Sequence, residues 1–186
     1  MSGVWTRNYT NMLAGALGGG GVEPSTGSAN YSNNNLSLHQ RDNGYTRYVY
    51  SAWTYFQKFP QLQNVGYGNA NADQPRLLFG TGTTAPTYDD WKLETPNTNF
   101  TLSQNNITVD SYGYNATNHS YYSTRRFVVQ YTGSAEITIT EFGLFCYSSL
   151  MYREVFDTPI TLNQYESVVL EFTQEFPLVN YEPYPT

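Results

Sequence analysis

Alternating apolar and polar residues in the last third of the chain predict β-strands. Ile137 and Ile139 lie two positions apart, and the run Ser167–Phe172 carries apolar residues at every second position from Val168. Because successive side chains of a strand point to opposite faces, each set shares one face of a sheet, which no helix would achieve. We interpret residues 136–176 as two strands, joined by a structured connection, that belong to two packed sheet layers.

Shorter apolar runs between residues 77 and 131 predict further strands. A buried strand at Leu77–Phe79 leads into a Gly/Thr turn, and Asn-rich turns separate four short antiparallel strands further on. These four are Phe100–Leu102, Ile107–Val109, Tyr112–Tyr114 and Arg126–Tyr131. The predicted fold is mainly β, an antiparallel β-sandwich of jelly-roll or Ig-like type, with an N-terminal arm and at most one short helix.

Residues 45–59 fit two patterns. Asn43-Gly44 stands between two apolar-containing runs and tolerates the backbone angles of a tight hairpin turn. Helical spacing competes with this interpretation and indicates an amphipathic helix that stops at Pro60. The residues at that spacing are Tyr45, Val49, Ala52, Phe56 and Phe59. The helix is slightly favoured, and the hairpin stays the alternative.

The two ends of the chain differ from its body, which we place at residues 36–176. Residues 1–35 form a poorly charged arm in which Gly18–Gly21 is expected to be a hinge. Residues 177–186 are rich in proline, which cannot donate to a sheet, so an extended peripheral tail is expected. The candidate contacts with neighbouring subunits are Trp5, Tyr9, Leu13, Leu17, Tyr181 and Tyr184.

Composition favours a single binding or assembly domain. The 186 residues include 18 tyrosines and only 13% charged residues, against ~25% in an average soluble domain. A neutral, aromatic surface of this kind suits contacts with proteins or sugars. The net charge of -6 has the wrong sign for phosphate recognition, which argues against a nucleic-acid partner. No run approaches the ~20 apolar residues of a membrane span, and no secretory signal is visible, so we expect synthesis in a cytoplasm.

Reactive residues are sparse and scattered. Cys146 follows an apolar run and is interpreted as buried and inert, and His39 and His119 lack the neighbours of a zinc site. Asp89 and Asp90 diverge on an extended chain, so turn capping is favoured over a catalytic pair. We therefore predict no cofactor, no metal and no catalytic residues.

Two other functions stay open. Exposed aromatic rings could stack on a sugar, which makes the chain a carbohydrate-binding module; the candidates are Trp53, Tyr55, Trp91, Tyr121 and Tyr122. A small glycan-cleaving enzyme would need two carboxylates ~5 to 9.5 Å apart in a cleft. The carboxylates considered are Asp89, Asp90, Glu141 and Glu154, and nothing in their spacing identifies such a pair.

Three blocks, in order, resemble accessory structural proteins of tailed bacteriophages. They are Trp5–Tyr9, Gly80–Leu93 and the segment 137–176, where Glu141–Leu144, Leu150–Arg153 and Thr158–Leu162 are most similar. Residues 22–74 are not matched. The chain also departs from the family pattern at Asn163–Glu166, where a glycine is more usual in the turn before the last strand, and in the Tyr-rich insertion 45–59.

The resemblance implies a virion component built around a β-sandwich on the head, neck or tail, with no catalytic residues to transfer. We accordingly expect a non-enzymatic virion structural protein that assembles with itself and with other virion proteins. A carbohydrate-binding module of a phage tail or fibre, with a host glycan as ligand, is the alternative.

Overall fold

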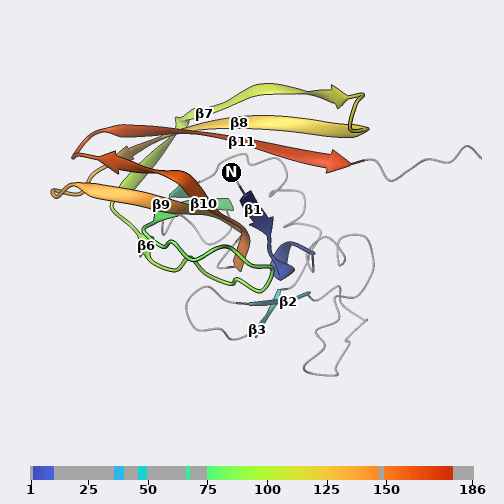
Figure 1. Cartoon of the computed structure of the whole chain (residues 1–186), viewed down its shortest axis with the longest axis horizontal. Coiled ribbons are helices and arrows are strands. Elements are labelled where there is room, and N and C mark those ends of the chain that lie inside the picture. The colour runs from blue at the N-terminus through green and yellow to red at the C-terminus, as the bar shows by residue number, and fades with distance from the viewer. Residues whose placement is uncertain are drawn as a thin grey trace, which may run out of the picture.

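Two sheets packed face to face form the body of the molecule (Figure 1). The computed structural model describes residues 2–10, 36–39, 46–49, 66–67, 75–146 and 149–177. The first sheet has the order β1-β10-β9-β5-β4, with β6 paired to β5, and the second has the order β11-β8-β7. All pairings within these two sheets are antiparallel except that of β4 with β5. The predicted mainly β sandwich is confirmed.

The strands vary widely in length. The first sheet comprises β1 (Ser2–Trp5), β4 (Gly66–Tyr67), β5 (Pro75–Gly80), β6 (Pro96–Asn97), β9 (Ile137–Cys146) and β10 (Ser149–Leu162). The second comprises β7 (Phe100–Asn115), β8 (Ser120–Tyr131) and β11 (Ser167–Pro177). A separate pair consists of β2 (Leu36–His39) and β3 (Thr46–Val49).

The core lies between the two sheets and follows the predicted alternation. Val168, Leu170 and Phe172 of β11 are all buried and share a cluster with Ile139 of β9. From β8 the same cluster receives Phe127, which is fully buried. Burying such side chains stabilises by roughly 1.5–3 kcal/mol each, which explains why period-two patterning determines this fold.

The connection between the two predicted strands is itself a strand. β10 pairs with β9 along most of its length, but four residues, 156–159, face only Thr140. The resulting bulge leaves Asp157 and Pro159 exposed. The expectation of two strands in two sheet layers is confirmed, and the structured connection between them is β10, whose periodicity polar and charged residues concealed.

The short strands predicted between residues 100 and 115 are one strand. β7 runs unbroken from Phe100 to Asn115 beside β8, and its Asn-rich positions are register shifts, not turns. One shift lies between Leu102 and Ile107, and the other lies between Val109 and Ser111. Bulges accommodate such extra residues without ending a strand.

Near residue 45 the structure shows the antiparallel strand pair of the hairpin alternative and not the helix that was slightly favoured. β2 pairs with β3 antiparallel, with Leu36 opposite Val49 and His39 opposite Thr46. The helix predicted for residues 45–59 is therefore wrong over Thr46–Val49, because strand pairing overrides a weak helical periodicity. The rest of that segment lies outside the described residues.

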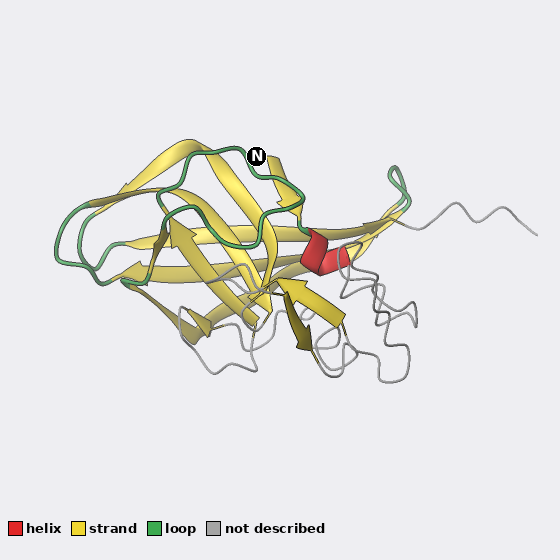
Figure 2. Ribbon diagram, turned by 90° about the horizontal axis from the view of Figure 1, so that it is seen from below, coloured by secondary structure: helices red, strands yellow, loops and turns green. Residues whose placement is uncertain are grey.

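Residues 2–10 belong to the body. β1 pairs with β10, and Thr6 then donates from its amide to Met151 O at 2.9 Å and from its hydroxyl to Leu150 O at 2.5 Å. One helical turn follows at residues 7–10, and it lies against the sandwich (Figure 2). Trp5 and Tyr9 pack on the core cluster, with ring centroids 4.1 Å apart.

Candidate functional site

The C-terminal ends of β7 and β11 and the N-terminal end of β8 extend beyond the first sheet (Figures 1 and 2). This part of the second sheet has no covering strand among the described residues. Tyr114 lies opposite Tyr121 in the register, with ring centroids 5.3 Å apart. Tyr112, two residues before Tyr114, shares its face and is 80% exposed. Tyr114 and Tyr121 are 46% and 55% exposed. We name Tyr112, Tyr114 and Tyr121 the tyrosine surface.

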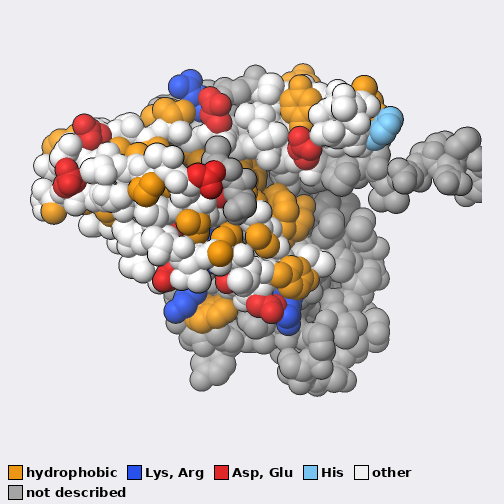
Figure 3. All heavy atoms as spheres, viewed as in Figure 1, with side chains coloured by type: hydrophobic (Ala, Val, Ile, Leu, Met, Phe, Trp, Pro, Cys, Tyr) orange, Lys and Arg blue, Asp and Glu red, His pale blue; other side chains and the backbone are white. Residues whose placement is uncertain are grey.

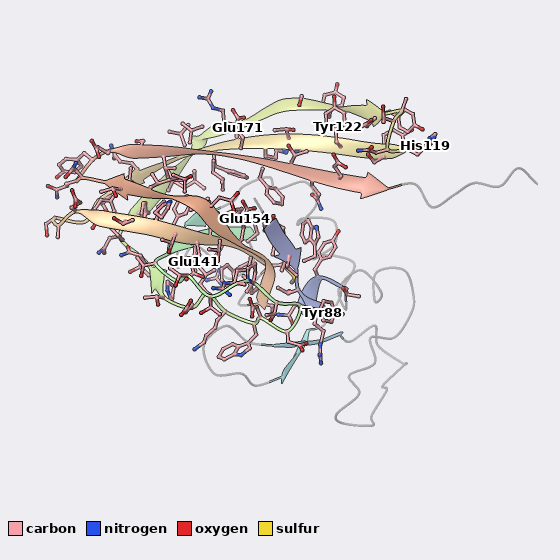
Figure 4. All side chains as sticks on the ribbon, in the orientation of Figure 1. Tyr88, His119, Tyr122, Glu141, Glu154 and Glu171 are labelled. Carbon is pink, nitrogen blue, oxygen red and sulfur yellow. The ribbon has the colours of Figure 1, made fainter. Side chains whose placement is uncertain are left out.

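The tyrosine surface ends at a structured turn. His119 has a φ of 47°, and its Nδ1 lies 2.9 Å from the Tyr114 hydroxyl. Asn115 Oδ1 accepts hydrogen bonds from the amides of Thr117 and Asn118, at 3.0 and 3.3 Å. Figure 4 shows His119 at the tip, and hydrophobic side chains gather beside the histidine in Figure 3. The turn thus holds the tyrosines on a defined scaffold.

Tyr121 and Tyr122, which the sequence grouped as a stacking pair, lie on opposite faces of the sheet. Tyr122 stands opposite Gly113, where an added Cβ would come within 3.2 Å of its hydroxyl. An aromatic ring over a cross-strand glycine is a known way to cover exposed backbone. Tyr122 also lines a shallow hollow of about 500 Å³ with Thr124, Thr173 and Glu175. The two tyrosines therefore cannot act on the same ligand ring.

The other predicted contact residues are dispersed. Trp91 is half-buried in the loop of residues 81–95, where Lys92 Nζ lies 4.9 Å from its ring centroid. Trp5 and Tyr9, proposed as arm contacts, pack on their own core. Six candidates lie outside the described residues: Leu13, Leu17, Trp53, Tyr55, Tyr181 and Tyr184.

The carboxylate of Glu141 organises the loop of residues 81–95. Glu141 is fully buried and sits on the face of the first sheet that this loop covers (Figure 4). Its Oε1 accepts from the amides of Gly82 and Thr95, at 3.1 and 2.9 Å. Its Oε2 accepts from the Glu94 amide at 3.2 Å and from Arg153 Nε at 2.9 Å. Three of these four hydrogen bonds come from the loop, and the fourth comes from Arg153 of β10.

Gly80 and Gly82 make this approach possible. A Cβ on Gly80 would lie 2.5 Å from Glu141 Oε1, and one on Gly82 would lie 2.6 Å from the same oxygen. The Gly/Thr turn predicted here thus has a specific purpose, because only glycine leaves room for the carboxylate.

Arg153 joins Glu141 to the acidic loop residues. Its Nη1 donates to Asp90 Oδ2 at 2.8 Å, and the Asp90 carboxylate also accepts from the Thr87 amide and hydroxyl. Burial lowers the pKa of Arg153, but the hydrogen bonds to Asp90 and Glu141 outweigh it, so the pKa is raised. Asp89 pairs with Arg7, and both aspartates line a small pocket of about 210 Å³ with Arg7 and Asn8. The predicted turn-capping role is confirmed for Asp90, which accepts from the Thr87 amide.

Glu154 lies apart from that network. The Tyr152 hydroxyl donates to its Oε2 at 2.7 Å, and burial together with this neighbouring carboxylate raises the pKa of Tyr152. Gly3 of β1 provides the space, since a Cβ there would overlap the Tyr152 ring. The carboxylates considered for glycan cleavage are thus held by structural partners: Asp89, Asp90, Glu141 and Glu154.

Sequence reasoning did not find the Glu141–Arg153 pair or the pairing of Tyr114 with Tyr121. The first pair is 12 residues apart and meets diagonally across the β9–β10 register. The second needs a strand over residues 120–125, the first half of β8, where the sequence predicted none. The available signal was the isolated Arg within an apolar run at Leu150–Arg153.

Other reactive groups give no site among the described residues. Cys146 is buried, as predicted. Within the described part of the chain, no three His, Cys, Asp or Glu side chains are grouped to hold a metal ion. None of the described helical residues forms a segment long and apolar enough to cross a membrane.

Comparisons with protein-family models, with curated proteins and with solved structures found no match for this chain. Function is therefore inferred from the geometry of the tyrosine surface.

Proposed function

We propose that this chain is a non-enzymatic structural subunit that assembles with copies of itself and with other proteins through the tyrosine surface. The observation that carries the proposal is three exposed tyrosines on one face of a sheet extension. Tyrosine offers a large contact area at low rotamer cost and is enriched at protein interfaces. The setting we propose is the virion of a tailed bacteriophage, and it rests on the sequence resemblance alone.

The contacts of the buried carboxylates support a structural role. Glu141 and Asp90 share Arg153, and among the described residues their other hydrogen-bond donors lie in the loop of residues 81–95. A catalytic carboxylate pair needs access to a substrate in a cleft. The fully buried Glu141 has none, so its placement favours folding over catalysis.

A glycan is the second candidate ligand, and the tyrosine surface also supports it. The adjacent, tilted rings of Tyr114 and Tyr121 offer an exposed apolar face, and the Tyr112 ring lies two residues away. In this alternative the chain is a carbohydrate-binding module of a phage tail or fibre. Trp91 lies in a different loop and takes no part in such a site.

Sedimentation velocity over a concentration series tests the first proposal. We expect the wild-type chain to self-associate and the double variant Tyr112→Ser/Tyr121→Ser to be monomeric, because two exposed rings leave the interface. Tyr165→Ser is the matched control, since Tyr165 is 66% exposed but lies in another turn. A double variant that associates as well as the wild type would contradict the role of the tyrosine surface.

A glycan array probed with the same three proteins tests the alternative. Binding of a defined glycan by the wild type and the control, but not by the double variant, would favour the carbohydrate-binding module. Monomeric wild-type protein with no glycan bound would remove both candidates.

A further inference from the structure

The second sheet has an open edge at β11. This strand pairs with β8 through 11 consecutive residues without a register shift, and β11 is the last strand of its sheet among the described residues. An edge strand carries a row of amides and carbonyls that can pair with another chain. Natural edges are usually protected by charged side chains, proline or a bulge. From Ser167 to Phe176, β11 has no proline and no bulge, and its only charges are the two glutamates Glu171 and Glu175, which a basic partner strand would pair with.

The opposite edge of the same sheet differs. β7 contains two register shifts against β8, at Leu102–Ile107 and at Val109–Ser111. Bulges twist an edge and interrupt its pairing pattern, so β7 is a poor template for a further strand. Of the two edges, β11 is therefore the one suited to accept a partner.

An apolar groove runs beside this edge. It has a volume of about 690 Å³ and lies between β11 and the bulged part of β10. Its apolar lining comes from Phe156, Ile160, Val168, Val169 and Leu170, and Asp157, Thr158 and Glu171 also line it. Because Val168 and Leu170 belong to the core face, the groove is an opening into the space between the sheets. A strand added beside β11 would place every second side chain in this opening.

The outward face of β11 is acidic. Val169, Glu171, Thr173 and Glu175 alternate with the core residues, and the two glutamates are four residues apart. On the β8 side, Glu171 lies opposite Arg126, whose Nε is 3.9 Å away, and Glu175 lies opposite Tyr122. Figure 4 shows Glu171 on this strand of the upper layer. A strand on the open side would therefore face two carboxylates, which opposite charges stabilise.

We propose that β11 accepts an extended strand of a partner protein by β-strand addition. The partner strand alternates apolar residues, which fill the groove, with outward residues that include two Lys or Arg four positions apart, opposite Glu171 and Glu175. Backbone hydrogen bonds to β11 supply affinity, and the groove and the two carboxylates supply specificity. The proposal does not depend on the role of the tyrosine surface, although Tyr114 and Glu175 line the same shallow hollow.

The negative charges of β11 argue against a second copy of this chain as the strand that pairs with it. The chain carries a net charge of -6, and β11 contains two glutamates and no Lys or Arg. Antiparallel self-pairing centred on Thr173 sets Glu171 opposite Glu175, and like charges directly opposite are destabilising. A basic partner strand avoids this repulsion.

A synthetic peptide of about nine residues tests the proposal, a length typical of a strand. It alternates Ile or Val with Thr, except that Lys replaces two of the threonines, four positions apart. Fluorescence anisotropy with the full chain is expected to show saturable binding, and backbone NMR is expected to place the shifts on β11. A version N-methylated at alternate amides should not bind, because it cannot pair with a strand.

The charge assignment has matched controls. Replacing both lysines of the peptide by Glu, or using the protein variant Glu171→Gln/Glu175→Gln, should weaken binding by about threefold to tenfold. Glu136→Gln, at an exposed site away from β11, should bind as the wild type does. Equal binding of the Lys and Glu peptides would overturn the basic partner, and equal binding of the N-methylated peptide would overturn strand addition.

Two further outcomes distinguish self-pairing from binding of a partner strand, and the β11 edge from the tyrosine surface. A wild-type chain that does not bind the peptide but dimerises, and that dimerises more tightly as Glu171→Lys because a cation then faces Glu175, would overturn the proposal in favour of self-pairing. Tyr112→Ser/Tyr121→Ser should still bind the peptide, so failure of the assembly proposal and failure of strand addition are told apart.

Discussion

At the scale of single residues, Tyr165 is the clearest case of a position where backbone conformation and residue type disagree. It has a φ of 69° in the turn of residues 163–166, which joins β10 to β11. The left-handed region costs a side-chain-bearing residue roughly 1–2 kcal/mol, which is why the absence of glycine here was notable in the sequence. The turn is held by hydrogen bonds from the Tyr165 amide to Tyr131 O at 2.8 Å and from the Asn163 amide to Glu166 Oε2 at 2.6 Å.

Two substitutions of Tyr165 test this strain. Tyr165→Gly is expected to be more stable than Tyr165→Ala by about 1 kcal/mol, because both remove the exposed ring but only glycine tolerates the positive φ. Urea denaturation of the two variants measures the difference directly. Equal stabilities would show that the turn relaxes to a negative φ when the ring is removed.

Glu141 and Arg153 give a second test at this scale. Glu141→Gln should lower the free energy of unfolding by about 3–5 kcal/mol, since it leaves the buried Arg153 without a charged partner at Nε. Glu136→Gln, at an exposed position, should change it by less than about 0.5 kcal/mol. Chemical denaturation compares them, and a loss no larger than that of the control would contradict the role of Glu141 in holding the loop.

At the scale of elements, β1 is held in place by side chains from several strands. Trp5 packs against Tyr152 and Phe172, with ring centroids 5.0 and 6.0 Å away, and so links β1 to both sheets. The interpretation of residues 1–35 as an arm outside the body does not fit this packing over residues 2–10. The described part of the predicted arm is an edge strand of the sandwich.

A Trp5→Ala variant measures that contribution. We expect a loss of about 2 kcal/mol, below the ~3–5 kcal/mol of a fully buried aromatic residue, because Trp5 is only partly buried. Thermal and urea unfolding give the value, and Tyr88→Ala, an exposed residue outside the core, is the control. If the loss of stability is no larger than that of the control, β1 contributes little to the stability of the body.

The sequence predicted strands well where burial imposes a regular alternation, and poorly where that alternation is interrupted. Leu77–Phe79 and the alternation at Ser167–Phe172 lie in strands because burial enforces a period of two. In β7 and β10 the extra residues of bulges break that period, so strands looked like turns or connections. The candidate site was harder still, because Tyr114 and Tyr121 become neighbours only through the first half of β8, residues 120–125, which the sequence did not predict as a strand.

At the scale of the whole molecule, the second sheet has two halves with different support. In β8, Phe127 and Val129 are fully buried between the sheets, whereas Tyr121 is 55% exposed in the extension. Local opening is cheapest where few apolar contacts hold the backbone. The half that carries the tyrosine surface should therefore be the less stable one, even though both halves belong to the same strands.

Amide hydrogen exchange of the full chain tests this gradient. We expect slow exchange at Phe127–Tyr131, where opening requires the sandwich to separate, and exchange at least about tenfold faster at Tyr121–Thr124, where pairing with β7 and β11 is the main restraint. Binding of a subunit or ligand to the tyrosine surface should slow the second set and leave the first unchanged. Equal protection of both sets in the free chain would mean that the extension is as rigid as the core. In that case a partner would meet a preformed surface and would lose no affinity to ordering it.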